Sequence, residues 1–248
     1  MVALMKKLLL EDMKSDFSIE HFFVFPIYKI RVDPNSYDKE KILNDIEYNK
    51  SLKNKRNDAH QAIGHHSNIH HSYNDFNNED FRIINYEKLI EVYQKVFTDF
   101  FDNQLTTVQK FEWKFDIVNY SAMTEGQWLS SHSHLGYVSH SGHMTTAFAC
   151  IHYLNFKKEH SSTTFENPAK FAEFIQITQP ELLGILDKSV PENSYLCETW
   201  EVPTGEDGMI IFPAALKHEV KLQGPTKESR ITISTNIEIR RMTSDFIH

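Results

Sequence analysis

Four of the 14 histidines in the chain fall within the segment SHSHLGYVSHSGH, residues 131–143. Two of them, His132 and His134, form a His-x-His pair, and side chains at positions i and i+2 of a β-strand point to the same side. Two imidazoles placed in this way could converge on one metal ion at about 2.0–2.2 Å. A third ligand has to come from another segment, and His218 is the best candidate because it follows an apolar run that bends at Pro213. The pair alone is equally typical of a polar surface loop.

The other histidines lack this pattern. His140 and His143 lie in a segment with two glycines, which predicts a loop, so we expect a loop or substrate-facing role for them rather than metal ligation. A second cluster, in GHHSNIHHSY, has neither strand alternation nor a distant partner, and we predict a polar loop near the mouth of the site. That cluster comprises His65, His66, His70 and His71.

A polar strand follows His218 in the sequence. Arg230 begins the segment RITISTNIEI, in which isoleucines alternate with polar residues. The guanidinium group presents a planar fork that matches a carboxylate with two hydrogen bonds, and the Thr232 hydroxyl lies on the same face of the strand. A face of this composition is typical of the lining of a barrel. The exposed face of a β-sandwich is the alternative.

The elements that must position these residues are mainly β-strands. Alternating or apolar runs predict strands in five segments: 22–32, 110–120, 145–156, 208–212 and 230–239. A helix is predicted over 85–105, with one apolar stripe that should pack on the outside of a sheet. Asn35 or Ser36 should cap another helix that runs through Ile46. We therefore predict a mainly β fold with flanking helices, of the jelly-roll or barrel type.

The 248 residues fit one domain, because no linker-like segment divides the chain. We expect residues 1–109 to form a mixed α/β part and residues 110–240 to form the jelly-roll core. An insertion is expected at about 157–200, with a short helix over 168–177. The net charge of −8 argues against a general nucleic-acid-binding protein.

Two features of the sequence indicate the cellular compartment in which the protein occurs. Two cysteines, Cys150 and Cys197, are fewer than a secreted disulfide scaffold normally carries. The apolar stretch near Met1 is short and is interrupted by Glu11 and Asp12, unlike a signal peptide, and the longest later apolar run is too short to span a bilayer. We therefore expect a cytoplasmic protein without a membrane partner. The sequence leaves open whether the chain forms a homodimer.

Several motifs together resemble a known family. In order they are HSH (132–134), IHYLNF (151–156), TTFENP (163–168), GMIIFPAALKH (208–218) and ESRITISTNI (228–237). They resemble the 2-oxoglutarate- and Fe(II)-dependent oxygenases, most closely a phage and bacterial group related to prolyl hydroxylases. The segments FFVFPIYKI and SNIHHSYNDF resemble the N-terminal part of that group. The resemblance implies a double-stranded β-helix, which agrees with the predicted jelly roll.

The resemblance also implies a metal site, from which this chain departs. The family's usual iron ligands are His-x-Asp/Glu and a distal histidine. Here His132 matches the first ligand and His218 the distal one, whereas His134 stands at the carboxylate position. Three neutral imidazoles leave Fe(II) with its full charge, so the site could bind iron, prefer zinc, or take a carboxylate from elsewhere. Glu166 is the first candidate for that carboxylate and Asp116 the second.

By the same resemblance, Arg230 and Thr232 would bind the distal carboxylate of 2-oxoglutarate. Asn119 and Tyr120 could also reach the oxoacid, although ordinary strand-end hydrogen bonding explains them equally well. The implied reaction couples oxidative decarboxylation of 2-oxoglutarate to hydroxylation of a C–H bond in a protein side chain, such as proline, or in a small molecule. Two alternatives stay open: a cupin-type three-histidine oxygenase or isomerase that needs no oxoacid, and a non-catalytic metal-binding jelly roll.

Overall fold

The computed structural model describes much of the chain. The described residues are 26–52, 69–72, 75, 79–105, 107, 110–134, 145–168, 177–178, 180–185, 187 and 197–242. Several predictions fall outside them. These are the start of the predicted strand 22–32, most of the predicted helix 168–177, and His65, His66, His140 and His143.

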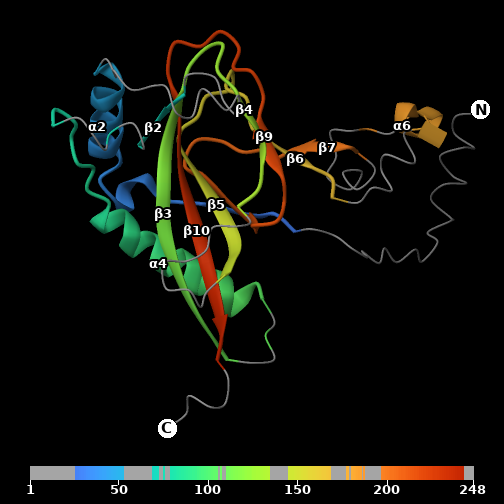
Figure 1. Cartoon of the computed structure of the whole chain (residues 1–248), viewed down its shortest axis with the longest axis horizontal. Helices are drawn as coiled ribbons and strands as arrows, with labels where there is room; N and C mark the ends of the chain where they lie inside the picture. Colours follow the sequence, from blue (N-terminus) through green and yellow to red (C-terminus); the bar gives the residue numbers. More distant parts are fainter. Residues whose placement is uncertain are drawn as a thin grey trace, which may run out of the picture.

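The described strands form two antiparallel sheets (Figure 1). The six-stranded sheet has the order β1 (Tyr28–Arg31), β8 (Gly208–Pro213), β5 (Thr145–Asn155), β10 (Arg230–Arg241), β3 (Phe111–Met123) and β2 (His70–His71). The four-stranded sheet has the order β4 (Leu129–His132), β9 (His218–Val220), β6 (Thr163–Glu166) and β7 (Thr199–Glu201). Sequence neighbours are rarely sheet neighbours, as expected of a jelly roll, so the predicted fold class is confirmed.

Three α-helices are described: α2 (Lys39–Ser51), α4 (Glu87–Asn103) and α6 (Pro180–Ile185). The helix predicted over 85–105 is α4. The predicted cap at Asn35 or Ser36 is wrong, because Pro34–Ser36 forms a separate 3-10 turn, η1, whose cap Asp33 accepts a hydrogen bond from the Asn35 N–H at 3.0 Å. Pro34 suits the first position of such a turn, and α2 begins only after Asp38.

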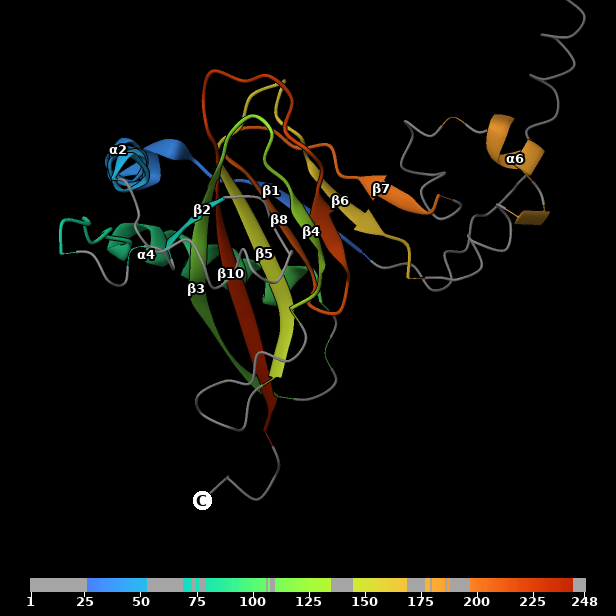
Figure 2. The same cartoon turned by 45° about the horizontal axis from the view of Figure 1, so that its top comes forward.

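Helices α2 and α4 lie on one face of the six-stranded sheet, and the four-stranded sheet lies on its other side (Figure 2). The isoleucines of β10 point toward the helices. They join the apolar stripe of α4 in one core, which includes Ile231, Ile233, Ile237, Tyr93, Phe97 and Phe100. Each side chain of this size stabilises the fold by about 1.5–3 kcal/mol when fully buried. The prediction that the α4 stripe packs outside a sheet is confirmed.

The opposite face of β10 looks between the two sheets. Arg230, Thr232 and Asn236 are all buried there, although each is polar. A smaller apolar core fills the rest of this interior, with Phe165 and Phe212 among its members. The alternation of β10 thus separates a helix-covered apolar face from a polar interior.

The segment 157–200, which the sequence predicts to be an insertion, contains a strand of the four-stranded sheet. Its first part includes β6, which pairs with both β7 and β9 and therefore belongs to the four-stranded sheet. Cys150 and Cys197 are buried, with no disulfide between them. In the described ranges, no helix is both long and apolar enough to cross a membrane.

Candidate metal centre

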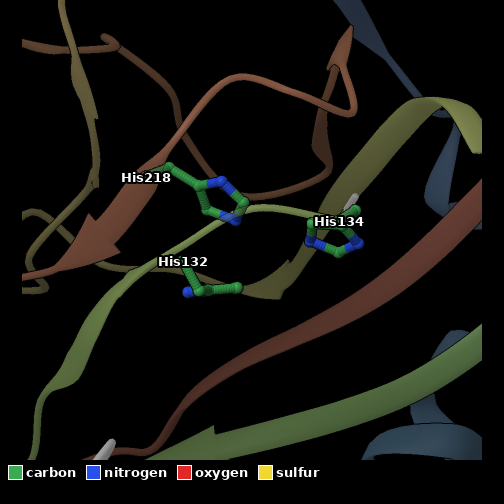
Figure 3. Close-up of side chains that lie close together, drawn as sticks. All are labelled: His132, His134 and His218. Atoms are coloured by element: carbon green, nitrogen blue, oxygen red, sulfur yellow. The ribbon is translucent and has the colours of Figure 1, made fainter. Parts of the chain in front are cut away.

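Three imidazoles come together between the sheets, from His132, His134 and His218 (Figure 3). One ring nitrogen of each lies within 4.8 Å of the others. The ring centroids of His132 and His218 are 4.3 Å apart, and those of His134 and His218 are 5.3 Å apart. Small rotations of these side chains would place all three nitrogens on one ion at about 2.0–2.2 Å.

Sheet pairing and one loop contact hold the three residues. His132 ends β4 and pairs with His218, which begins β9. His134 lies beyond the end of β4, where its backbone N–H donates to the Ala214 carbonyl at 2.9 Å. The two histidines were expected to lie on one strand, but only His132 does. The turn after β8 holds His134 in place instead.

Hydrogen bonds donated by the Nδ1 atoms orient the rings. The Nδ1 atoms of His132 and His218 face the Ser130 and Leu216 carbonyls at 2.9 and 3.2 Å. A carbonyl oxygen only accepts, so each Nδ1 carries the proton and donates. The neutral tautomer then has its lone pair on Nε2. In metal-binding histidines, the ring nitrogen that does not bind the metal usually donates such a hydrogen bond, which sets the tautomer and the orientation of the ring.

The third ring has a side-chain partner instead. His134 Nδ1 lies 2.6 Å from Asn236 Oδ1, on the interior face of β10. Burial lowers the pKa of His134 to about 4 and holds the pKa of His218 well below its usual value. Both imidazoles are thus neutral at pH 7, the state in which histidine binds a metal.

Aromatic rings surround the buried side of the cluster. Phe212 packs edge-on against His218 with ring centroids 4.9 Å apart, and Phe165 lies 5.5 Å from the same imidazole. These rings belong to the apolar core between the sheets. They exclude water from one side of the three histidines, of which His132 is half-buried and the other two are buried.

Neither predicted carboxylate joins the cluster. Thr163 and Phe165 of β6 face the interior, so Glu166 points the other way, where it accepts a hydrogen bond from Ser131. Asp116 is exposed, and its carboxylate lies 3.9 Å from Lys114. Within the described part of the chain, the three histidines are the only group of three or more histidine, cysteine or acidic side chains close enough to share an ion.

Arg230 lies in the same interior and is 1% exposed. Its guanidinium donates to the Ser161 carbonyl at 3.0 Å and to Thr163 Oγ1 at 3.3 Å, and it lies 5.3 Å from the centre of the Tyr153 ring. Burial lowers its pKa. No carboxylate of the described residues lies within ion-pair distance of it.

The neighbouring polar residues divide between the two faces of the sheet. Thr232 shares the interior face with Arg230, and its hydroxyl lies 3.0 Å from that of Ser121. Asn119 pairs with Ser234 of β10 and is half-buried on that face. Tyr120 points to the helix side, where its hydroxyl donates to Asp75 at 2.5 Å. The structure therefore does not bring Tyr120 to the predicted oxoacid site.

Strand β6 connects the arginine to the histidines. Thr163, which accepts from Arg230, is two residues from Phe165, and Phe165 pairs with His218. Two residues of a strand span about 6.6 Å. Strand β6 therefore runs from the hydrogen bond with Arg230 to the strand partner of His218.

Sequence reasoning gave no role to several residues of this interior. Thr163, Ser121 and Tyr153 contact the predicted oxoacid residues, and Asn236 contacts His134. Asn236 is six residues after Arg230 on the same strand, and this even spacing could have placed it on the interior face. His71 was predicted to lie in a polar loop but is buried in β2, paired with Ser121.

Comparison with known proteins yields structural matches. No protein-family model and no curated protein sequence matches the chain. A viral collagen prolyl hydroxylase from Paramecium Bursaria Chlorella virus-1, solved as a 2-oxoglutarate complex, is 11% identical, with a TM-score of 0.45 over 86% of this chain and 95% of that one. A prolyl-4-hydroxylase from Pseudomonas putida is 9% identical, with a TM-score of 0.41 over 96% and 99%.

A 2-oxoglutarate-Fe(II) oxygenase family oxidoreductase from Burkholderia pseudomallei is 10% identical, with a TM-score of 0.38 over 63% of this chain and 60% of that one. Each of these solved structures is 11% identical to the chain or less. At such identities the similarity concerns the general fold, and the chemistry of this chain rests on its own residues.

Proposed function

We propose that this chain is a 2-oxoglutarate- and Fe(II)-dependent dioxygenase that hydroxylates a C–H bond of a protein side chain, such as proline, or of a small molecule. One observation carries the proposal. Three converging imidazoles and a buried guanidinium without a carboxylate partner among the described residues face one interior between the sheets. The two buried cysteines suit a reducing compartment, so we place the activity in the cytoplasm.

The histidine cluster fits a divalent metal. His132, His134 and His218 would hold the ion through their Nε2 atoms, because hydrogen bonds place the protons on Nδ1. Bound Fe(II) would supply oxygen activation coupled to decarboxylation of the oxoacid. The protein orients the ligands, keeps them neutral and excludes water with Phe165 and Phe212.

Arg230 fits the far carboxylate of the oxoacid. Removing a guanidinium from water costs several kcal/mol, whereas contacts with aromatic rings such as Tyr153 return about 2 kcal/mol. Two hydrogen bonds to neutral oxygens, on Ser161 and Thr163, recover part of the difference. A bound carboxylate would compensate the remainder, and Thr232 lies on the same face to assist.

A second candidate is favoured by the absence of a carboxylate from the histidine cluster, among the residues that the structure describes. Three neutral nitrogen ligands suit a cupin-type oxygenase that needs no oxoacid. In that case Arg230 would bind the substrate or stabilise the fold. A metal-binding protein without activity is the third alternative.

Calorimetric titration of the metal-loaded protein with 2-oxoglutarate tests the proposal. We expect binding by the wild type, a loss of about 30-fold or more in Arg230→Ala, and a smaller loss in Arg230→Lys, which keeps the charge but not the fork. Succinate should form only with iron and 2-oxoglutarate present. Absence of oxoacid binding in the wild type, or unchanged affinity in Arg230→Ala, would favour the three-histidine candidate.

Arg230→Met separates a ligand-binding role from a structural one. Methionine fills a similar space without a buried charge, so we expect the ligand-free protein to become more stable by about 1–4 kcal/mol while oxoacid binding disappears. Urea unfolding measures this change. A less stable Arg230→Met variant would assign the guanidinium to the fold instead.

A further inference from the structure

Among the described residues, Asn236 contributes the one side chain that contacts an Nδ1 atom of the histidine cluster. It is 5% exposed, and its Oδ1 lies 2.6 Å from His134 Nδ1. The other two partners are the backbone carbonyls of Ser130 and Leu216. A substitution leaves a backbone carbonyl in place, so Asn236 is the position at which the sequence controls how a histidine of this cluster is hydrogen-bonded.

The amide also determines which nitrogen of His134 carries the proton. An oxygen at Nδ1 requires the proton there and places the lone pair on Nε2, the nitrogen available to a metal. An apolar side chain would leave the buried Nδ1 without its acceptor and the ring without its orientation. A carboxylate in the same place would accept the same hydrogen bond and increase the basicity of the ring.

Charge gives the amide a second role. Three neutral imidazoles leave a divalent ion with its full positive charge, and no described carboxylate belongs to the cluster to offset it. The partner of His134 is itself neutral. The centre therefore keeps its attraction for an anionic ligand, which a carboxylate behind His134 would weaken.

We propose that Asn236 is a positioning residue that makes His134 a metal ligand through Nε2 and keeps the centre fully charged for an oxoacid. The inference rests on the proposed metal and oxoacid sites. It predicts effects of opposite sign. Replacing the amide by a carboxylate should tighten metal binding and weaken binding of the anionic ligand.

Two variants of similar size test this inference. Zn²⁺ affinity is measured by competition with a chelator, and 2-oxoglutarate affinity by calorimetry on the Zn²⁺-loaded protein. Asn236→Leu should lose about 10- to 100-fold in Zn²⁺ affinity. Asn236→Asp should gain about 10-fold in Zn²⁺ affinity and lose about 10-fold in oxoacid affinity. A purely structural role would lower both affinities in both variants.

The wild type provides a test that needs no variant. Nitrogen NMR of the metal-free protein should find His134 protonated on Nδ1. Protonation on Nε2 alone would overturn the inference. In Asn236→Leu the Nδ1 tautomer should lose its dominance, provided that circular dichroism and unfolding confirm a folded chain.

A His134→Ala background separates an effect through the imidazole from a general field. There, Asn236→Asp should leave Zn²⁺ affinity unchanged within about twofold, because coupled residues lose their interaction when one is removed. Persistent tightening would mean that the new carboxylate acts directly on the metal, which contradicts the inference. If wild type binds Zn²⁺ through His132 and His218 but ignores both Asn236 substitutions, the inference fails while the metal site stands. If wild type binds no metal, the proposed function fails first.

Discussion

Buried histidines occur on both faces of the six-stranded sheet, in contrasting surroundings. On the helix side, His152 of β5 is 0% exposed, and its Nδ1 lies 2.9 Å from the hydroxyl of Tyr93 on α4. On the interior side, His134 and His218 lie with His132 in one cluster. Burial lowers the pKa of His152 to about 3 and that of His134 to about 4, so both are neutral at pH 7.

The two regions differ in whether several metal-binding nitrogen atoms lie close together. Among the described residues, the rings in contact with His152 are those of Tyr37 and Tyr93, with centroids 5.8 and 5.7 Å away, and a tyrosine binds a metal only after it loses its proton. The interior cluster brings three imidazole nitrogens within 4.8 Å of one another. Folding alone gains little from lone pairs that face one another, whereas a cation would bind all three. Burial and a lowered pKa therefore do not distinguish a ligand from a packed histidine, but convergence does.

The largest expected effect separates the two regions directly. His218→Ala should reduce Zn²⁺ or Fe²⁺ affinity by at least about 100-fold, more than the loss of an outer partner would, and His132→Ala should do the same. His152→Phe should leave metal affinity unchanged within about twofold, because it lies on the other face of the sheet. Metal content after dialysis and chelator competition measure both.

The free energy of unfolding should change more in His152→Phe than in His218→Ala, which is the reverse of the order expected for metal affinity. His152→Phe leaves the buried Tyr93 hydroxyl without its hydrogen-bond partner, at a cost of about 1–3 kcal/mol. His218→Ala in the metal-free protein removes a desolvated imidazole from a crowded cluster and should cost less. The contrast breaks down if His218→Ala keeps full metal stoichiometry, or if His152→Phe loses it.

Much of the fold follows from the sequence, because long strands carry a strong pattern. The alternation in 230–239 predicts both β10 and the contrast between its faces, and the stripe in 85–105 predicts α4 and its packing. Short strands carry no such pattern. β9 has three residues and β6 has four, so only their pairing across the barrel reveals them, and the expected insertion at 157–200 hides a strand of the site.

The site is predictable where one strand fixes the geometry and not where tertiary contacts do. The shared face of Arg230 and Thr232 follows from strand parity. The hydrogen bond from His134 to Asn236 joins segments 102 residues apart, and no local spacing encodes it. Tyr120 neighbours an interior residue, Ser121, but alternation turns it to the helix side. A one-residue difference in a strand thus decides which chemistry a side chain can join.

A smaller effect concerns pH. Folded His152 resists protonation down to a pKa of about 3, whereas an unfolded histidine titrates near 6.5. The unfolded chain therefore binds more protons between these values, and stability should fall as the pH falls from about 6.5 toward 3, by about 1.4 kcal/mol per pH unit for this group. His134 and His218 act in the same direction. Urea unfolding of the metal-free protein at pH 7 and pH 5 should give a shallower dependence for His152→Phe; equal slopes would mean that His152 is already charged in the folded state.

The smallest expected effect is at Glu166, the carboxylate that sequence reasoning considered first for the missing ligand. Its side chain accepts a hydrogen bond from Ser131 on the face of β6 opposite Phe165, and Phe165 is the neighbour that packs against His218. Glu166→Gln keeps the shape and removes only the charge. We expect metal affinity within about twofold of wild type, since a screened charge on the far face of the strand adds little. A loss comparable to that of His218→Ala would instead make Glu166 a ligand, and it would mean that β6 turns this residue inward when the metal binds.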